Sequence, residues 1–220
     1  MGLFDAFRAL ARARGARAFH PCGVWFEGTV TGLPEGGFPL LADATPVTGR
    51  MSKGVGTAGA LPDVLGLAVR VPRGEGFDGP WDLALSSSGG NRVTRALPLP
   101  ARHWAAPRYG SIMPYWWRGR LRWLSAVAEP DAPVVAGSLR DLVDLLRTRP
   151  LAFTLSASSA GTGWRDIARL SVHRAIAPPE GISFDPVLNT PPGLDVAPAF
   201  LSRLRESAYE GSRRGRNANR

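Results

Sequence analysis

The chain has 220 residues, a mass of 23.5 kDa and a formal net charge of +9. Its 44% hydrophobic residues suffice for the core of one domain, and its single cysteine, Cys22, excludes a disulfide framework and a cysteine-rich zinc site. No apolar run reaches the roughly 18 residues of a membrane span, and residues 1–17 carry arginines without an apolar signal core. We therefore expect a cytoplasmic protein with no membrane span.

The first half of the chain predicts one helix followed by strands. Leu3, Phe7 and Leu10 recur at helical spacing and predict an amphipathic helix over residues 1–16. After residue 19 the apolar residues alternate with polar ones, which predicts a strand around residues 24–30. Further strands are expected at residues 38–42, 64–71, 81–86, 122–128, 151–157 and 167–176, and glycine- and proline-rich segments separate them at residues 32–37, 72–80 and 178–181.

Two further helices are expected in the second half. Ser138 is a suitable N-cap for a helix over residues 138–148, and Pro150 would end it. The last helix is expected over residues 197–209. The whole pattern predicts one α+β domain over residues 1–220, with an antiparallel barrel over residues 17–176, the insert helix at 138–148 and helices at its ends.

Familiar catalytic motifs do not explain the polar residues. The three histidines, His20, His103 and His173, stand at no metal-ligand spacing, so a metal hydrolase is not favoured. No nucleophile elbow or Walker loop occurs, and the glycines of residues 54–59 are a weak match to a nucleotide loop.

Arginines alternate with tryptophans over residues 102–123. Such a stretch can bind single-stranded nucleic acid by stacking and charge. The alternative is a half-buried strand, in which Leu121 and Trp123 face the core while Arg120 and Arg122 face solvent. We favour the strand and do not expect nucleic-acid binding.

Near the C-terminus Arg205 and Tyr209 stand four residues apart. On a helix this spacing places them on one face, where the guanidinium lowers the pKa of the phenol. A tyrosine phenolate is an anionic ligand suited to ferric haem.

Arg205 and Tyr209 belong to a wider set of segments in which the chain resembles the haem catalase superfamily. Residues 184–194 (FDPVLNTPPGL) and 205–209 (RESAY) resemble the stretch that leads into the proximal-tyrosine helix of catalases. Residues 17–23 (RAFHPCG), then 50–52 (RMS) and 81–83 (WDL), follow in the order of the catalase distal motifs. The similarity covers about residues 10–90 and 165–217, and the middle of the chain is unmatched.

The resemblance implies a fold, a cofactor and residue roles. It implies a catalase-like antiparallel β-barrel with flanking helices and a haem b pocket between the barrel and the C-terminal helix. Tyr209 would be the iron ligand, with Arg205 holding it as phenolate, and His20 the distal acid–base group. The remaining roles are a hydrogen bond from Ser52 to His20, Ser86 at the position of the distal asparagine, and propionate contacts from Arg17, Arg50 and Arg216.

The implied activity is that of a peroxidase or catalase-like oxidoreductase. Its substrate would be hydrogen peroxide or an organic hydroperoxide, used with a small reductant. Ser86 in place of asparagine, together with a trimmed pocket, leaves a non-catalytic haem carrier or sensor as the alternative. A homo-oligomer also stays open, since large catalases form tetramers.

Overall fold

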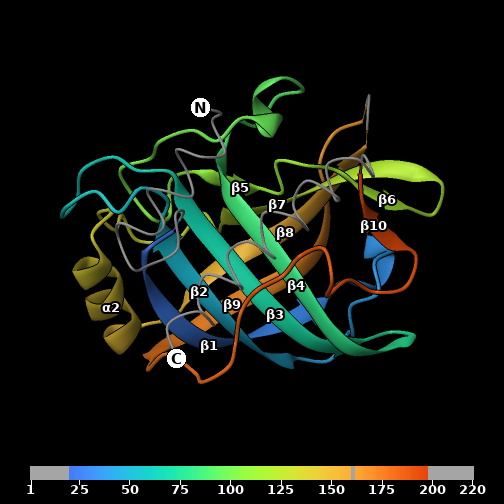
Figure 1. Ribbon diagram of the computed structural model, residues 1–220, viewed down its shortest axis with the longest axis horizontal. Coiled ribbons are helices and arrows are strands. Elements are labelled where there is room, and N and C mark those ends of the chain that lie inside the picture. Colours follow the sequence, from blue (N-terminus) through green and yellow to red (C-terminus); the bar gives the residue numbers. More distant parts are fainter. Residues whose placement is uncertain (1–19, 160–161, 198–220) are drawn as a thin grey trace, which may run out of the picture.

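Antiparallel strands close into a barrel in the computed structural model, which describes residues 20–159 and 162–197 (Figure 1). Around the barrel the order is β7-β5-β4-β3-β2-β1-β9-β8, and the pairing of β8 with β7 closes the ring. The eight barrel strands of these described residues are β1 (Cys22–Gly32), β2 (Thr45–Lys53), β3 (Leu65–Gly74), β4 (Phe77–Ser88), β5 (Arg108–Gly110), β7 (Arg120–Ala128), β8 (Leu151–Ser159) and β9 (Arg165–Ile176).

Shorter elements lie at the two ends of the barrel. At one end β10 (Leu194–Val196) pairs with β6 (Tyr115–Trp117), which extends from β7. At the other end α2 (Leu139–Thr148) packs against β9 and β1 (Figure 1). Two single-turn helices, η1 (Pro34–Gly36) and η2 (Thr94–Ala96), lie in loops. Within the part of the chain that the structure describes, no helix combines the length and apolarity needed to cross a bilayer.

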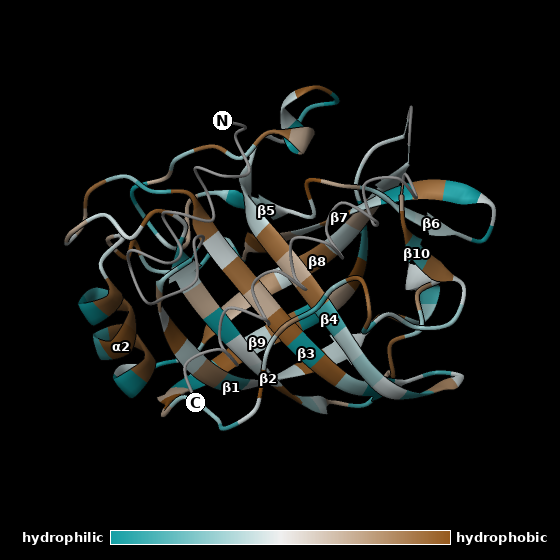
Figure 2. Ribbon diagram, viewed as in Figure 1, coloured by the Kyte–Doolittle hydropathy of each residue, from teal (hydrophilic) through white to brown (hydrophobic). Residues whose placement is uncertain are grey.

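The core fills the inside of the barrel. Along β3 and β4 every second side chain is buried and most of these are apolar, as the alternating bands on the two strands show (Figure 2). Phe26, Leu67, Leu124, Phe153 and Val172 are at most 1% exposed. The positions between them form the outer face, which carries the candidate site.

The sequence prediction of an antiparallel barrel is confirmed, and so is the insert helix. The side chain of Ser138 accepts the N–H of Asp141 at 3.0 Å, and α2 begins at the next residue. The strand predicted at residues 38–42 is wrong. Phe38 and Leu40 are buried there from a loop, and Pro39 between them has no N–H to join a ladder.

The separation predicted over residues 72–80 is confined to a turn at residues 75–76. β3 and β4 continue through Pro72 and Pro80, with a register shift at Pro72 and a turn in which Gly76 has a φ of +74°. β2 was not predicted, because its glycine, arginine and lysine obscure the alternation. Its Gly49 is required, since a Cβ there would lie 2.1 Å from Cζ of Phe26.

The two terminal helices expected from the sequence fall almost entirely beyond the described part of the chain. The helix expected over residues 1–16 lies outside the described residues, and so does the helix expected over 197–209 apart from its first residue.

Candidate functional site

His20 lies two residues before β1 and is held by both its backbone and its ring. Its φ of +56° places it in the left-handed region, and its N–H donates to the carbonyl of Gly54 at 2.8 Å. Its Nδ1 lies 2.9 Å from Oγ of Ser52, a buried side chain of β2. The ring also lies against Gly66 of β3, where a Cβ would approach His20 Cε1 to 2.6 Å. The structure thus brings His20 and Ser52 together, with Gly66 leaving room for the ring.

Arg50 holds the backbone of His20 and of the residue that follows it. Its Nη1 donates to the carbonyl of His20 at 3.0 Å and its Nη2 to that of Pro21 at 3.4 Å. The guanidinium carbon lies 6.0 Å from the ring centre of Trp25, and the residue is 9% exposed. These contacts give Arg50 a role in positioning His20; the propionate contact implied by the resemblance stays a prediction.

Small residues occupy the outer face of β3 and β4 beside this histidine. Residues directly opposite each other on paired strands share a face. The register aligns Ser52 with Gly66 and Ser86, and Arg50 with Ala68 and Ala84. We call Gly66, Ala68, Ala84 and Ser86 the small-residue patch. It presents no bulky side chain, and His20, Ser52 and Arg50 line one border of it.

Ser86 is the third residue of the aligned row Ser52, Gly66 and Ser86. It is half-buried, opposite Gly66 on one side and Gly110 on the other. Two strand spacings, roughly 10 Å, separate its backbone from that of Ser52. Ser86 and His20 therefore belong to the same face without touching each other through any hydrogen bond that the described residues show.

A buried carboxylate anchors residues 183–189 to the far border of the patch. Asp82 of β4 is fully buried and receives two hydrogen bonds from Arg70, both 2.6 Å long. It also accepts the N–H of Asp185 and the side-chain amide of Asn189, each at 2.7 Å. Its own N–H donates to the carbonyl of Asn189. We call residues 183–189 the strap.

The glycine loop after β2 uses its N–H groups internally. The carboxylate of Asp63 accepts the N–H groups of Val55, Gly56 and Thr57 at 2.8–2.9 Å. Burial raises the pKa of Asp63, but these hydrogen bonds outweigh it and leave the pKa below its ordinary value. The N–H groups that a phosphate would need are thus already bound, which argues against a nucleotide loop here.

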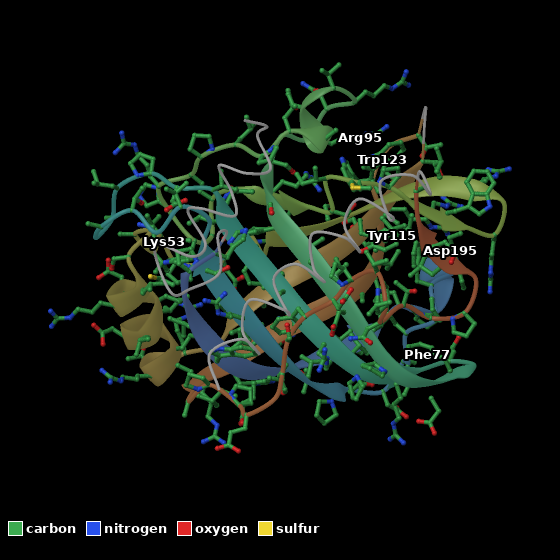
Figure 3. All side chains as sticks on the ribbon, in the orientation of Figure 1. Lys53, Phe77, Arg95, Tyr115, Trp123 and Asp195 are labelled. Carbon is green, nitrogen blue, oxygen red and sulfur yellow. The ribbon has the colours of Figure 1, made fainter. Side chains whose placement is uncertain are left out.

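Lys53 lies beside this loop, at the end of the barrel near α2 (Figure 3). It is 2% exposed, and its ammonium donates to the carbonyls of Gly59 and Leu61. The two remaining histidines lie elsewhere: His173 contacts Thr29 on the exposed face of β9, and His103 pairs with Ala136. Among the described residues no three histidine, cysteine or acidic side chains gather as a metal site.

The arginine and tryptophan stretch has the opposite parity to the one expected. Arg122 shares the face of Leu124, which is part of the core, whereas Trp123 lies on the outer face. There the guanidinium of Arg95 stacks 3.6 Å from the ring centre of Trp123 (Figure 3). Trp104 and Trp117 are buried, as expected for core residues. The assignment of Arg122 to solvent and Trp123 to the core is therefore wrong.

Four of the predicted site residues, Arg17, Arg205, Tyr209 and Arg216, lie outside the described residues. Sequence reasoning also missed parts of the site. The small-residue patch and the Asp82 anchor gave a weak signal, because alanine, glycine and a lone aspartate are common in any strand.

Comparison with known proteins leaves the family open. No protein-family model matches the chain, and no curated protein matches it either.

Proposed function

We propose that the chain is a haem-dependent oxidoreductase of catalase-like fold that acts on hydrogen peroxide or organic hydroperoxides. The observation that carries the proposal is the hydrogen bond of 2.9 Å between His20 Nδ1 and Ser52 Oγ beside the small-residue patch. A planar cofactor needs a face without bulky side chains, and a distal acid–base group needs its ring held at the border of that face. The described residues offer both.

The strap gives the proposal a second support. The segments that carry the resemblance, residues 81–83 and 184–194, are about 100 residues apart in the chain. Asp82 and Asn189, one from each segment, are joined by a hydrogen bond of 2.7 Å. Chance likeness between short motifs gives no reason for the two segments to meet on the same face.

Each residue of the proposed site would have a separate role. Ser52 engages Nδ1 of His20, and the proposal assigns proton exchange with the substrate to the other ring nitrogen, Nε2. It would take the proton from the near oxygen of the peroxide and return it to the far oxygen, which leaves as water from hydrogen peroxide or as an alcohol from an organic hydroperoxide. The two electrons for this cleavage would come from the haem, and the small reductant would restore them as the near oxygen is reduced to water. Tyr209, with Arg205, would hold the iron, and the bound haem would supply the redox chemistry.

Ser86 favours a second candidate. A serine hydroxyl reaches less far than the amide of an asparagine, so the side of the small-residue patch away from His20 offers the peroxide a shorter donor. A haem carrier or sensor of the same fold would bind haem without consuming peroxide beyond the rate of free haem.

Replacement of single histidines tests the proposal. Purified protein loaded with one equivalent of haem should consume peroxide faster than free haem, and His20→Gln should lower that rate by about 100-fold or more. His173→Gln, on the exposed face of β9, is the matched control and should leave the rate unchanged. Equal rates for wild type and His20→Gln would overturn the peroxidase proposal, and tight haem binding with that result would favour the carrier or sensor.

A further inference from the structure

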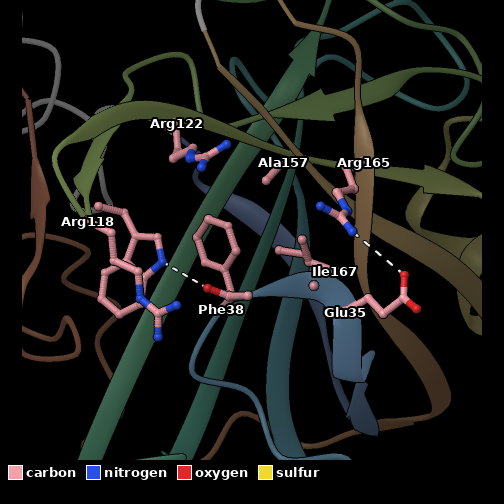
Figure 4. A pocket seen from close by; sticks show the side chains of 10 residues that line it. Glu35, Phe38, Arg118, Arg122, Ala157, Arg165 and Ile167 are labelled. Carbon is pink, nitrogen blue, oxygen red and sulfur yellow. Dashed lines mark hydrogen bonds and ion pairs between the residues drawn. The ribbon is translucent and has the colours of Figure 1, made fainter.

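A separate pocket lies at the end of the barrel away from His20. A cavity of about 160 Å³ opens between the segment that follows β1, the β6–β7 turn and the strands β8 and β9 (Figure 4). His20 precedes β1 and Glu35 follows it, and the eleven residues of β1 span roughly 35 Å. The pocket is therefore distinct from the candidate haem face, and a ligand bound in it would be independent of the proposed function.

Strand register places two guanidinium groups at this mouth. Arg122 stands directly opposite Ser159, and Ala157 stands opposite both Leu124 and Arg165. Opposite residues share a face, and Leu124 belongs to the core. By this register Arg122 and Arg165 stand in the rows of the inner face at the mouth of the barrel, and Figure 4 shows them on either side of Ala157. The mouth of a barrel is a frequent place for small ligands.

The rim of the pocket carries excess positive charge. Arg118, Arg122 and Arg165 line it with one acid, Glu35, which leaves a formal charge of +2. Glu35 lies 3.7 Å from Arg165, and both side chains are largely exposed, so this ion pair is weak and can yield to a ligand.

Arg122 has a hydrogen-bond donor without an acceptor. Its Nη1 donates to Ser159 Oγ at 2.7 Å, but its Nε is buried without a hydrogen-bond partner. A buried N–H without an acceptor is unfavourable, and a guanidinium presents its donors in a fork that fits the two oxygens of a carboxylate.

The floor of the pocket is apolar and aromatic. Phe38 stacks on Trp117 with ring centres 5.9 Å apart, and Ile167 and Ala157 complete the floor. The Nε1 of Trp117 donates to the carbonyl of Gly37 at 3.0 Å, which fixes the indole. A cavity of this volume accommodates a single benzene-sized ring.

From this combination we infer that the pocket binds a small organic carboxylate, with one ring or a short apolar chain on the Phe38 and Trp117 floor and its carboxylate on Arg122 and Arg165. Benzoate is the simplest probe of that chemistry. A neutral analogue, benzamide, has the same ring without the charge, and inorganic phosphate has the charge without the ring.

Calorimetric titration of the full-length protein tests the inference. We expect saturable binding of one benzoate per chain with a Kd at or below about 10 mM. Arg122→Gln should weaken it at least about tenfold. Arg120→Gln removes the same charge from the same hairpin outside the pocket and should change the Kd less than about twofold. Benzamide and phosphate should bind more weakly than benzoate.

A second variant keeps the test decisive if Arg122→Gln fails to fold. Ala157→Leu fills the floor with a larger apolar side chain and should abolish benzoate binding while leaving every arginine in place. No saturable heat with benzoate would overturn the inference. So would an equal loss of affinity in Arg120→Gln, which would indicate a general attraction of anions to a basic chain. Phosphate binding as tight as benzoate would overturn the assignment to a ring-bearing carboxylate.

Discussion

Ser52 holds the His20 ring from the neighbouring strand, while Arg50 holds the backbone beneath it. The two contacts are complementary, since Ser52 fixes Nδ1 of the ring and Arg50 fixes the backbone carbonyl of His20. A ring that can rotate about its Cβ spends less time with Nε2 toward a substrate. Under the haem proposal Ser52 would therefore act through His20, as a positioning residue.

Removal of the Ser52 hydroxyl should slow peroxide turnover more than it weakens haem binding. Proton transfer by a positioned group contributes about 100- to 10,000-fold, so loss of its positioning partner in Ser52→Ala should cost roughly tenfold in rate per haem. The pH profile of that rate should also shift, because Nδ1 loses its hydrogen-bond partner.

Ser88→Ala is the matched control for this variant. Ser88 lies two residues beyond Ser86 on β4, and its Oγ is buried without a hydrogen-bond partner. Its replacement should leave rate and pH profile unchanged. An unaltered rate in Ser52→Ala would contradict the role given to this serine.

Asp63 organises the loop after β2, and its neutralisation should destabilise the fold. At pH 7 Asp63→Asn loses charge-assisted hydrogen bonds from three backbone N–H groups, which we expect to cost about 2 kcal/mol of unfolding free energy. Urea denaturation measures the difference. Asp43→Asn, an exposed carboxylate, is the control and should denature like wild type.

The pH dependence of that difference has a definite sign. The pKa of Asp63 is lowered in the folded protein, so its contribution is complete above the ordinary pKa and is lost as pH falls through the folded value. The gap between wild type and Asp63→Asn should therefore be full from about pH 5 to 7 and should narrow below about pH 4. A gap that widens in acid would contradict this assignment.

The strap and β4 form one unit through a single carboxylate. Asp82 lies where β5 no longer pairs with β4, since that pairing covers only residues 86–88. Its N–H and carboxylate then bind residues 185 and 189, so the strap continues the hydrogen bonding of the strand edge. Arg70 supplies the balancing charge from β3.

Asp82→Asn should release the strap. Removal of one partner from a buried ion pair leaves the other charge uncompensated, and we expect a loss of about 3 kcal/mol in unfolding free energy. Limited proteolysis should then cut within residues 183–189 faster than in wild type. Glu27→Gln removes the carboxylate of an exposed pair with Arg174 on the same barrel and should alter neither measurement. Unchanged proteolysis in Asp82→Asn would contradict the anchoring role.

Elements with a clean pattern were the predictable ones. β8 and β9 alternate apolar and polar residues, and Ser138 with Asp141 marks the start of α2, so local physics specifies them. Residues 38–42 failed because buried apolar side chains of a loop copy the alternation of a strand. β2 was missed because Gly49 and Lys53 take interior positions for tertiary reasons: the space that Phe26 needs and the carbonyls of Gly59 and Leu61.

The barrel as a whole separates two places where chemistry can occur. The end of β1 at His20 borders the small-residue patch, and the end at Glu35 leads to the arginine rim. Part of the +9 charge gathers at this mouth through Arg118, Arg122 and Arg165. A charge count alone could not locate it, because the inward direction of Arg122 follows from strand register that no local pattern reveals.

The candidate site could be predicted only where the sequence resembles a known motif. His20 and Ser52 form one such pair, and Asp82 and Asn189 form the other. The structure joins the members of each pair by a hydrogen bond. Gly66, Ala68 and Ala84 could not be assigned in advance, because their meaning comes from the alignment of three strands distant in the chain. The resemblance in sequence therefore suggested haem as the cofactor, and the strand topology suggests the small-residue patch as the face that would receive it.

The visible absorption spectrum of the purified ferric protein, recorded for wild type and for Tyr209→Phe, is the decisive test of the haem proposal. We expect wild type loaded with one haem to show a Soret band with the charge-transfer pattern of a ferric tyrosinate, and we expect the variant to lose that pattern. A wild-type chain that takes up no haem, or a spectrum that Tyr209→Phe leaves unchanged, would contradict the proposal.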